Sequence, residues 1–150
     1  MIGPTPNCYH RLKPHTFAPS NISWGVEDHT AMVRMKDVGE ENCHIEMRAA
    51  SGLANPYLAA AGVLAAGLLG LNEKGELPTP SKGPSEDDPK HQKLAGSLED
   101  ALIALKKDKA MQEMLGADFV KLFVTVKEAE LARFRSHVTD WERDEYLELY

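Results

Sequence analysis

Polar and apolar residues alternate over residues 44–48 (His-Ile-Glu-Met-Arg), and this period of two predicts a β-strand. Because successive side chains of a strand point to opposite faces, His44, Glu46 and Arg48 are expected to share one face. An imidazole, a carboxylate and a guanidinium side by side suit an anionic substrate held next to a metal ion. The same pattern also fits an edge strand whose three polar side chains are hydrated, since charged residues are mostly exposed.

The pattern divides the chain into a strand-rich first third and a helical remainder. Several prolines break any helix in residues 1–50. Three short apolar runs in this part predict antiparallel strands at residues 22–24, 31–35 and 43–48, joined by turns at 25–29 and 37–42. The predicted fold class is therefore α+β, with antiparallel strands followed by helices.

Helical signals begin after residue 52. Asn55 is a suitable N-cap and Pro56 a suitable first residue for a helix that is rich in Ala and Gly almost all round. Close packing would offset the low helix propensity of its glycines, so we expect this helix to lie buried against the sheet. The elements predicted beyond residue 52 are this buried helix over 53–72, an irregular surface loop over 73–96 and further helices over 97–150, which end in a polar and aromatic tail. Ser97, with Asp100 three residues on, resembles a capping box and is the predicted N-cap of the first of these helices.

Composition narrows the class of protein. The 150 residues, 43% hydrophobic and 27% charged, are typical of one globular unit. A net charge of −6 without a basic cluster argues against nucleic-acid binding. The apolar stretch 53–71 is too weakly apolar to span a membrane, and the first residues lack the pattern of a secretion signal. Cys8 and Cys43 form no CxxC motif, so buried, reduced cysteines in a cytoplasmic protein are expected.

Four segments occur in the order and spacing of the glutamine synthetase family. They are N-C-Y-H-R-L-K-P at 7–14, S-W-G at 23–25, H-I-E-M-R at 44–48 and A-N-P-Y-L-A at 54–59. Each segment is a weak signal alone, but together they make the chain resemble the family from about residue 5 to residue 150. The resemblance implies the C-terminal part of the catalytic domain, in a protein that forms a homo-oligomeric ring.

The resemblance implies an ATP-dependent ligase, in which the γ-carboxylate of glutamate is phosphorylated and then attacked by ammonia or an organic amine. Glu46 resembles a ligand of Mg²⁺ or Mn²⁺. Arg11 and Arg48 resemble arginines that bind glutamate, and Arg34 resembles one close to the ATP phosphates, so these three are the candidate catalytic residues. The alternative for each arginine is a surface salt bridge or a sheet-edge cation.

Phe17 departs from the family pattern in a way that bears on the substrate. Glutamine synthetases have a flap glutamate at this position that helps to form the ammonium site. An aromatic ring there suits contact with the carbon chain or the charge of an organic amine, and filling of a loop core is the alternative. Together with the Trp-Gly turn at 24–25, Phe17 resembles the γ-glutamylputrescine synthetase and γ-glutamyl-amide ligase branch.

His29 and His44 stand where the family usually has arginines on the ATP side. Both are kept as candidates for ATP binding, and His29 also for substrate binding, although an imidazole lacks the guanidinium fork that binds phosphate. The replacements leave open a non-catalytic structural homologue such as lengsin, the lens member of the family. The chain alone is expected to be inactive, because other site residues of the family lie upstream.

Overall fold

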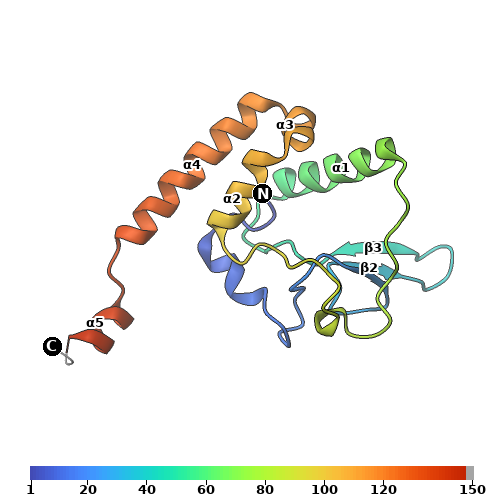
Figure 1. The fold of residues 1–150 in the computed structure, drawn as a ribbon, viewed down its shortest axis with the longest axis horizontal. Helices are drawn as coiled ribbons and strands as arrows, with labels where there is room; N and C mark the ends of the chain where they lie inside the picture. The colour runs from blue at the N-terminus through green and yellow to red at the C-terminus, as the bar shows by residue number, and fades with distance from the viewer. Residues whose placement is uncertain (148–150) are drawn as a thin grey trace.

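The computed structural model describes residues 1–147, in which strands are followed by helices (Figure 1). A 3₁₀-helix, η1 (Pro6–Arg11), precedes the strands β1 (Trp24–Val26), β2 (Val33–Lys36) and β3 (His44–Met47). The helices are α1 (Pro56–Glu73), α2 (Leu98–Lys107), α3 (Lys109–Leu115), α4 (Ala117–Ser136) and α5 (Asp140–Tyr146), with a 3₁₀-turn, η2 (Ser85–Asp87), before α2. The predicted α+β fold class is confirmed.

The strands form one sheet in the order β1-β2-β3. β2 and β3 pair antiparallel as predicted, but β1 pairs with β2 in parallel, so the prediction of three antiparallel strands is wrong for this pair. The cause lies in the segment between β1 and β2, where the carboxylate of Asp28 accepts hydrogen bonds from the backbone N and the hydroxyl of Thr30. This turn returns the chain to the start of β1, where the N of Val33 donates to the carbonyl of Ser23 at 3.0 Å.

The apolar face of the sheet is covered only in part. Ile45 is 68% exposed although it lies on this face. The indole N of Trp24 donates to the carbonyl of Pro78 at 2.6 Å, which draws the loop after α1 across the sheet. A cavity of about 420 Å³ remains between loop and sheet, lined among others by Trp24, Met35, Ile45, Leu77 and Pro78. Cys43 was expected to be buried but is exposed, because it lies in the turn before β3, whereas Cys8 is buried.

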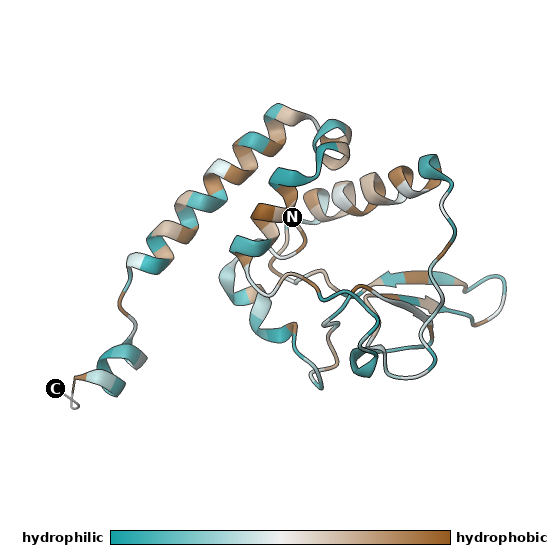
Figure 2. Cartoon of the chain, viewed as in Figure 1, coloured by the Kyte–Doolittle hydropathy of each residue, from teal (hydrophilic) through white to brown (hydrophobic). Residues whose placement is uncertain are grey.

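Helix α1 begins as predicted but is not buried. The side-chain oxygen of Asn55 accepts hydrogen bonds from the N of Tyr57 at 3.0 Å and of Leu58 at 3.3 Å, and Pro56 is the first helical residue. Within the described chain, Ala65 is the single buried residue of α1, and large apolar side chains such as Leu64 and Leu71 are exposed. Figure 2 shows mostly pale and brown residues along this helix.

A cavity also separates part of α1 from the sheet. It has a volume of about 260 Å³ and is lined on the sheet side by Met32 and Met47 and on the helix side by Gly62, Val63 and Ala66. Because Ala65 alone is buried in α1 (Pro56–Glu73), the prediction of a helix buried against the sheet is wrong.

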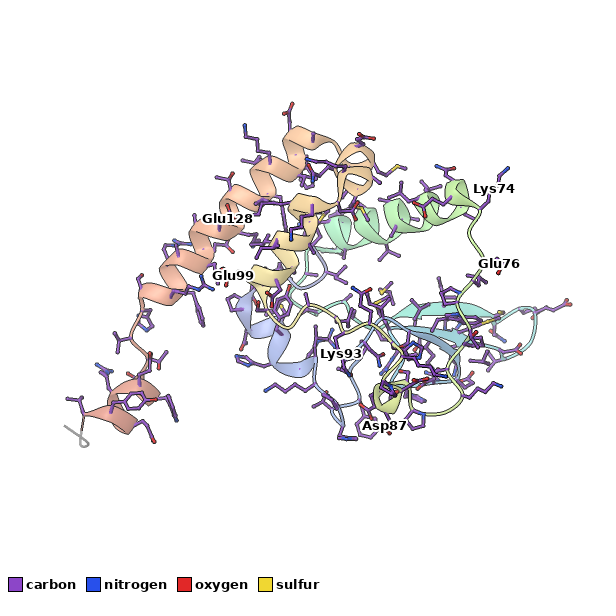
Figure 3. The ribbon with its side chains drawn as sticks, viewed as in Figure 1. Lys74, Glu76, Asp87, Lys93, Glu99 and Glu128 are labelled. Atoms are coloured by element: carbon purple, nitrogen blue, oxygen red, sulfur yellow. The ribbon has the colours of Figure 1, made fainter. Side chains whose placement is uncertain are left out.

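Two helices carry the main hydrophobic core. Leu98 and Leu102 of α2 are buried against Val120 and Val124 of α4. Ion pairs also join these helices, between Lys106 and Glu128 at 2.6 Å and between Arg135 and Glu99; Figure 3 labels the two glutamates. The N-cap predicted at Ser97 is confirmed, because its hydroxyl accepts from the N of Asp100 at 3.1 Å.

The C-terminal region contains two short helices that the sequence analysis did not separate. α3 begins where the Asp108 carboxylate accepts from the N of Met111 at 2.9 Å, and it ends at Gly116, whose φ of 90° breaks the helix. α5 begins with a capping box between Thr139 and Glu142, within the stretch expected to be a tail. The last residues of that predicted tail, 148–150, lie outside the described residues. Figure 1 shows α4 and α5 running away from the sheet.

The loop over 74–97 is irregular, as expected, but its middle is anchored. Ser85 is fully buried, and its carbonyl accepts a hydrogen bond from the side-chain amide of Asn21 at 2.6 Å. The backbone N of Ser81 donates to the carbonyl of Trp24 at 2.9 Å. The loop therefore forms part of the support beside β1. Across residues 1–147, no helix has the length and apolar character needed to cross a bilayer.

The close packing of this loop on β1 makes Gly25→Ala destabilising. A Cβ on Gly25 would overlap the hydroxyl of Ser81 and lie 2.9 Å from the Cβ of Asp28. We expect a loss of about 2 kcal/mol in the free energy of unfolding, measured with urea. Gly96→Ala is the matched control, because a Cβ there meets nothing within 4 Å. Equal losses in the two variants would contradict the steric argument.

Candidate functional site: a charged face of the sheet

One face of the sheet gathers the ionisable side chains. Strand alternation puts Arg34 and Lys36 on the same face as His44 and Glu46, with Arg34 paired opposite Glu46 in the register of β2 and β3. Arg48 follows β3 directly. We call this surface the charged face; it comprises Glu27, Arg34, Lys36, His44, Glu46 and Arg48.

Glu46 lies at the centre of the charged face. Its carboxylate accepts from Nη1 of Arg34 at 3.2 and 3.4 Å. Nε of Arg48 and Nε2 of His44 each lie 3.9 Å from one of its oxygens. The side chain of Glu46 is 35% exposed, so solvent reaches only part of it. β3 is an edge strand, as the alternative prediction requires, and the Glu46 carboxylate is partly hydrated and partly paired with Arg34.

Arg34 is the most buried member of the face, with a side chain 9% exposed. Besides Glu46 it binds the carboxylate of Glu27, which also lies 3.4 Å from Nζ of Lys36. Neither Glu27 nor Lys36 was predicted to belong to the site. Alternation with Arg34 was a sufficient signal for Lys36, whereas Glu27 reaches the face only because β1 and β2 pair in parallel.

Arg48 connects the charged face to the segment that carries Phe17. Its Nη2 donates to the backbone carbonyl of Phe17 at 3.0 Å. The ring of Phe17 is 77% exposed, so the alternative that it fills a loop core is wrong. The same segment is fixed from the other side, because the backbone N of His15 donates to the carboxylate of Glu86 at 2.7 Å. Phe17 is thus an exposed ring on an anchored loop beside Arg48.

Arg11 does not join the charged face directly. Its Nη2 donates to the carbonyls of Ala49 and Ala50, both at 2.7 Å, and its contacts with the carbonyl of Arg48 are 3.4 Å long. The guanidinium of Arg11 therefore provides hydrogen-bond donors for the backbone carbonyls that follow β3. These bonds hold the backbone at Arg48 in place. Arg11 thus supports the backbone beside Arg48, and its direct contact with glutamate stays a prediction.

The two histidines occupy different positions. Nδ1 of His44 donates to the carbonyl of Asn42 at 2.7 Å, which directs Nε2 toward Glu46. His29 is exposed in the turn before β2. Among residues 1–147, no hydrogen bond or ion pair joins the side chain of His29 to the charged face. The structure brings His44 to the predicted site and leaves His29 apart from it.

The residue next to His29 organises that turn. The carboxylate of Asp28 accepts from the hydroxyl of Ser81 at 2.6 Å and from the backbone N of Ser85 at 3.2 Å, in addition to its two bonds from Thr30. Partial burial raises the pKa of Asp28, but the hydrogen bonds from Ser81 and Thr30 outweigh it and lower the pKa. Asp28 thereby ties the β1–β2 turn to the loop beside the sheet.

The charged face offers one side chain that suits a divalent cation as a ligand, the carboxylate of Glu46. The carboxylate of Glu46 is a hard oxygen donor of the kind that Mg²⁺ and Mn²⁺ prefer, and it is accessible. Within residues 1–147 there is no group of three His, Cys, Asp or Glu side chains that suits a metal ion. The other ligands of an ion bound to Glu46 would therefore come from outside residues 1–147.

Comparison with known proteins gives a consistent result. A family model described as "Glutamine synthetase, catalytic domain" matches residues 1–146. The chain is 37% identical to the glutamine synthetase of Methanocaldococcus jannaschii, covering 98% of this chain and 34% of that protein. It is 34% identical to that of Halobacterium salinarum, covering 100% and 35%. A solved structure described as "GmaS/ADP complex-Conformation 1" has a TM-score of 0.82 at 32% identity, covering 98% of this chain and 35% of that one.

The chain thus spans about a third of the length of the curated relatives it matches.

Asp28→Ala tests the turn that carries His29. Because the pKa of Asp28 is lowered in the folded state, its ionised form stabilises the fold above the ordinary value of 3.8, and this contribution is lost as the pH falls through the folded pKa. We expect the variant to be about 2 kcal/mol less stable at pH 7, with the difference narrowing below pH 3.8. Urea unfolding across the pH range measures this.

Asp37→Ala, at an exposed carboxylate in the turn after β2, is the control and is expected to change stability little. A deficit of Asp28→Ala that stays constant into strong acid would contradict the role of the ionised carboxylate.

Proposed function

The chain belongs to the glutamine synthetase catalytic-domain family, and we propose that it is the C-terminal part of the catalytic domain of an ATP-dependent ligase. The ligase would join glutamate to ammonia or an organic amine through a γ-glutamyl phosphate. The observation that carries the proposal is the charged face, where Glu46 is set between Arg34 and Arg48. The remaining two thirds of a protein of the relatives' length would supply the other parts of the site, and in a homo-oligomeric ring neighbouring copies would lie beside it.

In this proposal each side chain has a part suited to its chemistry. Glu46 would be one ligand of Mg²⁺ or Mn²⁺, and the bound ion would neutralise charge on the transferring phosphoryl group. Arg34 would face the ATP phosphates, with His44 next to it in place of a guanidinium. Arg48 would bind a glutamate carboxylate, since its Nη1 has no hydrogen-bond partner among the described residues and its Nε lies 3.9 Å from Glu46.

Arg11 would act mainly through Arg48, because its guanidinium is engaged by the backbone that follows β3. A direct contact of Arg11 with glutamate would require exchange of those hydrogen bonds. His29 would reach ATP or substrate only from outside the charged face.

A specific observation also supports a second candidate, a non-catalytic homologue with a structural role. Arg34 is bound by two carboxylates, and two positions where the family has arginines hold histidines. Each of these features reduces the positive charge available to phosphate groups. Metal binding separates the two candidates, because a purely structural homologue has no need of a metal ligand at Glu46.

Glu46→Gln should weaken Mn²⁺ binding at least about tenfold in the complete protein that carries this chain, because an amide oxygen is a neutral and poorer ligand. Isothermal titration with MnCl₂ measures the dissociation constant. The matched control is Glu41→Gln, an exposed glutamate in the turn before β3. Mn²⁺ affinity equal to that of the unaltered protein in Glu46→Gln would contradict the metal role and favour the structural homologue.

We further propose that the acceptor is an organic amine in preference to ammonia, and that the enzyme belongs to the γ-glutamyl-amide or γ-glutamylputrescine branch. An exposed aromatic ring whose own carbonyl is bound by Arg48 supports this, because the ring then lies next to the proposed glutamate site. A phenyl ring favours contact with methylene groups or with an alkylammonium charge over contact with a small ammonium ion.

Phe17→Glu tests the amine preference. A carboxylate at this position attracts ammonium and removes the apolar surface, so the ratio of kcat/KM for the best amine to that for ammonia should fall about tenfold. Phosphate release with putrescine, methylamine and ammonium measures it. Phe134→Glu, at an exposed phenylalanine of α4 remote from the sheet, is the control. A protein that uses ammonia faster than every amine before any substitution would contradict the proposal.

A further inference from the structure

The guanidinium of Arg34 is shared unequally between two carboxylates. Its Nη2 makes a close contact with Glu27, whereas its Nη1 reaches the two oxygens of Glu46 only at 3.2 and 3.4 Å. An arginine that has a single carboxylate partner usually closes a fork on it, with two short parallel hydrogen bonds. Arg34 does not close that fork on Glu46, because one of its two terminal nitrogens is held elsewhere.

Glu27 is fixed in the position that makes this possible. It follows β1, where its backbone N donates to the carbonyl of Met35 at 3.0 Å. Its φ is 54°, a left-handed conformation that residues other than glycine rarely adopt. The side chain of Glu27 thus reaches Arg34 from the β1 side of β2, opposite to β3.

Glu27 also balances charge. Nζ of Lys36 lies 3.4 Å from it, so one carboxylate faces two cations. The hydrogen bond from Arg34 is the main cause that lowers the pKa of Glu27, so it is ionised at neutral pH. Without Glu27, three permanent cations of the charged face, Arg34, Lys36 and Arg48, would be balanced by Glu46 alone.

We infer that Glu27 is a positioning residue, which holds Arg34 away from a closed fork on Glu46 and so keeps the Glu46 carboxylate open to a divalent cation. This rests on the proposed function for the identity of the cation, but the hold on Arg34 is a property of the fold itself. If Glu27 is neutral, Arg34 turns to its remaining partner. A cation must then break a stronger ion pair and enter a more positive surface.

Glu27→Gln is the test, made in the complete protein that carries this chain. We expect the dissociation constant for Mn²⁺ to rise about tenfold, measured by titration with MnCl₂. Glu27→Asp should behave similarly, because the shorter side chain retains the charge but does not reach Arg34. Full recovery in Glu27→Asp would mean that net charge alone matters, and it would overturn the positioning role.

Glu40→Gln is the matched control. It removes the same charge from an exposed position in the turn that joins β2 and β3, and no ion pair or hydrogen bond of its side chain occurs among the described residues. Its Mn²⁺ affinity should stay within twofold of the unaltered protein. A loss equal to that of Glu27→Gln would also overturn the inference.

A double-mutant cycle isolates the part played by Arg34. In an Arg34→Gln background the guanidinium that competes for Glu46 is absent, so Glu27→Gln should have little further effect on Mn²⁺ affinity. The side-chain NMR signals of Arg34 give a readout free of metal. Restricted rotation of its Nη groups should be evident in the unaltered protein and should change in Glu27→Gln.

The outcomes separate the two proposals. If Glu46→Gln weakens Mn²⁺ binding and Glu27→Gln does not, the metal role stands and the inference about Glu27 is wrong. If neither changes Mn²⁺ affinity, the metal role fails, and the Arg34 signals decide alone. Signals unchanged by Glu27→Gln then refute the hold of Glu27 on Arg34 as well, and altered signals support that hold alone, without an effect on a cation.

Discussion

The near-complete burial of one guanidinium constrains the rest of this structure. Arg34 lies on the central strand of a three-stranded sheet, and a charged group removed from water must be paired. Its partners come from both neighbouring strands. Glu46 lies directly opposite Arg34 on β3, and Glu27 follows the end of β1. The parallel pairing of β1 with β2 is thus the arrangement that brings a second carboxylate to Arg34, and the electrostatics of the candidate site follow from it.

A second polar centre makes that arrangement possible. Parallel strands are usually joined by a long crossover, but here residues 27–32 alone join β1 to β2. The four hydrogen bonds accepted by Asp28 hold this connection against Ser81 and Ser85. Ser85 is fully buried, so its polar groups depend on the same contacts. The loop after α1 therefore supports the turn that delivers Glu27, although it carries no residue of the charged face itself.

Features that depend on residues close together in the sequence were predicted correctly, and features that depend on distant residues were not. Alternation and caps are local, so the shared face of His44 and Glu46, the cap at Asn55 and the cap at Ser97 were predictable from sequence. The partnership of Glu27 with Arg34 was not, because it depends on which way β1 runs. The burial of α1 was predicted wrongly, since apolar composition indicates that a helix is able to be covered but not which segment covers it.

The charged face has more positive than negative charge, and this imbalance limits what the chain does alone. Arg34, Lys36 and Arg48 face only Glu27 and Glu46. Because Glu27 is engaged by Arg34 and Lys36, the Glu46 carboxylate alone is not enough to hold a divalent cation. Such a face suits anions, namely phosphate and carboxylate groups, on one side of a site. In the proposed metal site, the other acidic ligands would come from the opposite side, which agrees with a chain that spans about a third of the length of its relatives. The same reasoning explains why Glu27 matters, because by binding Arg34 it keeps that guanidinium from closing two short hydrogen bonds on Glu46.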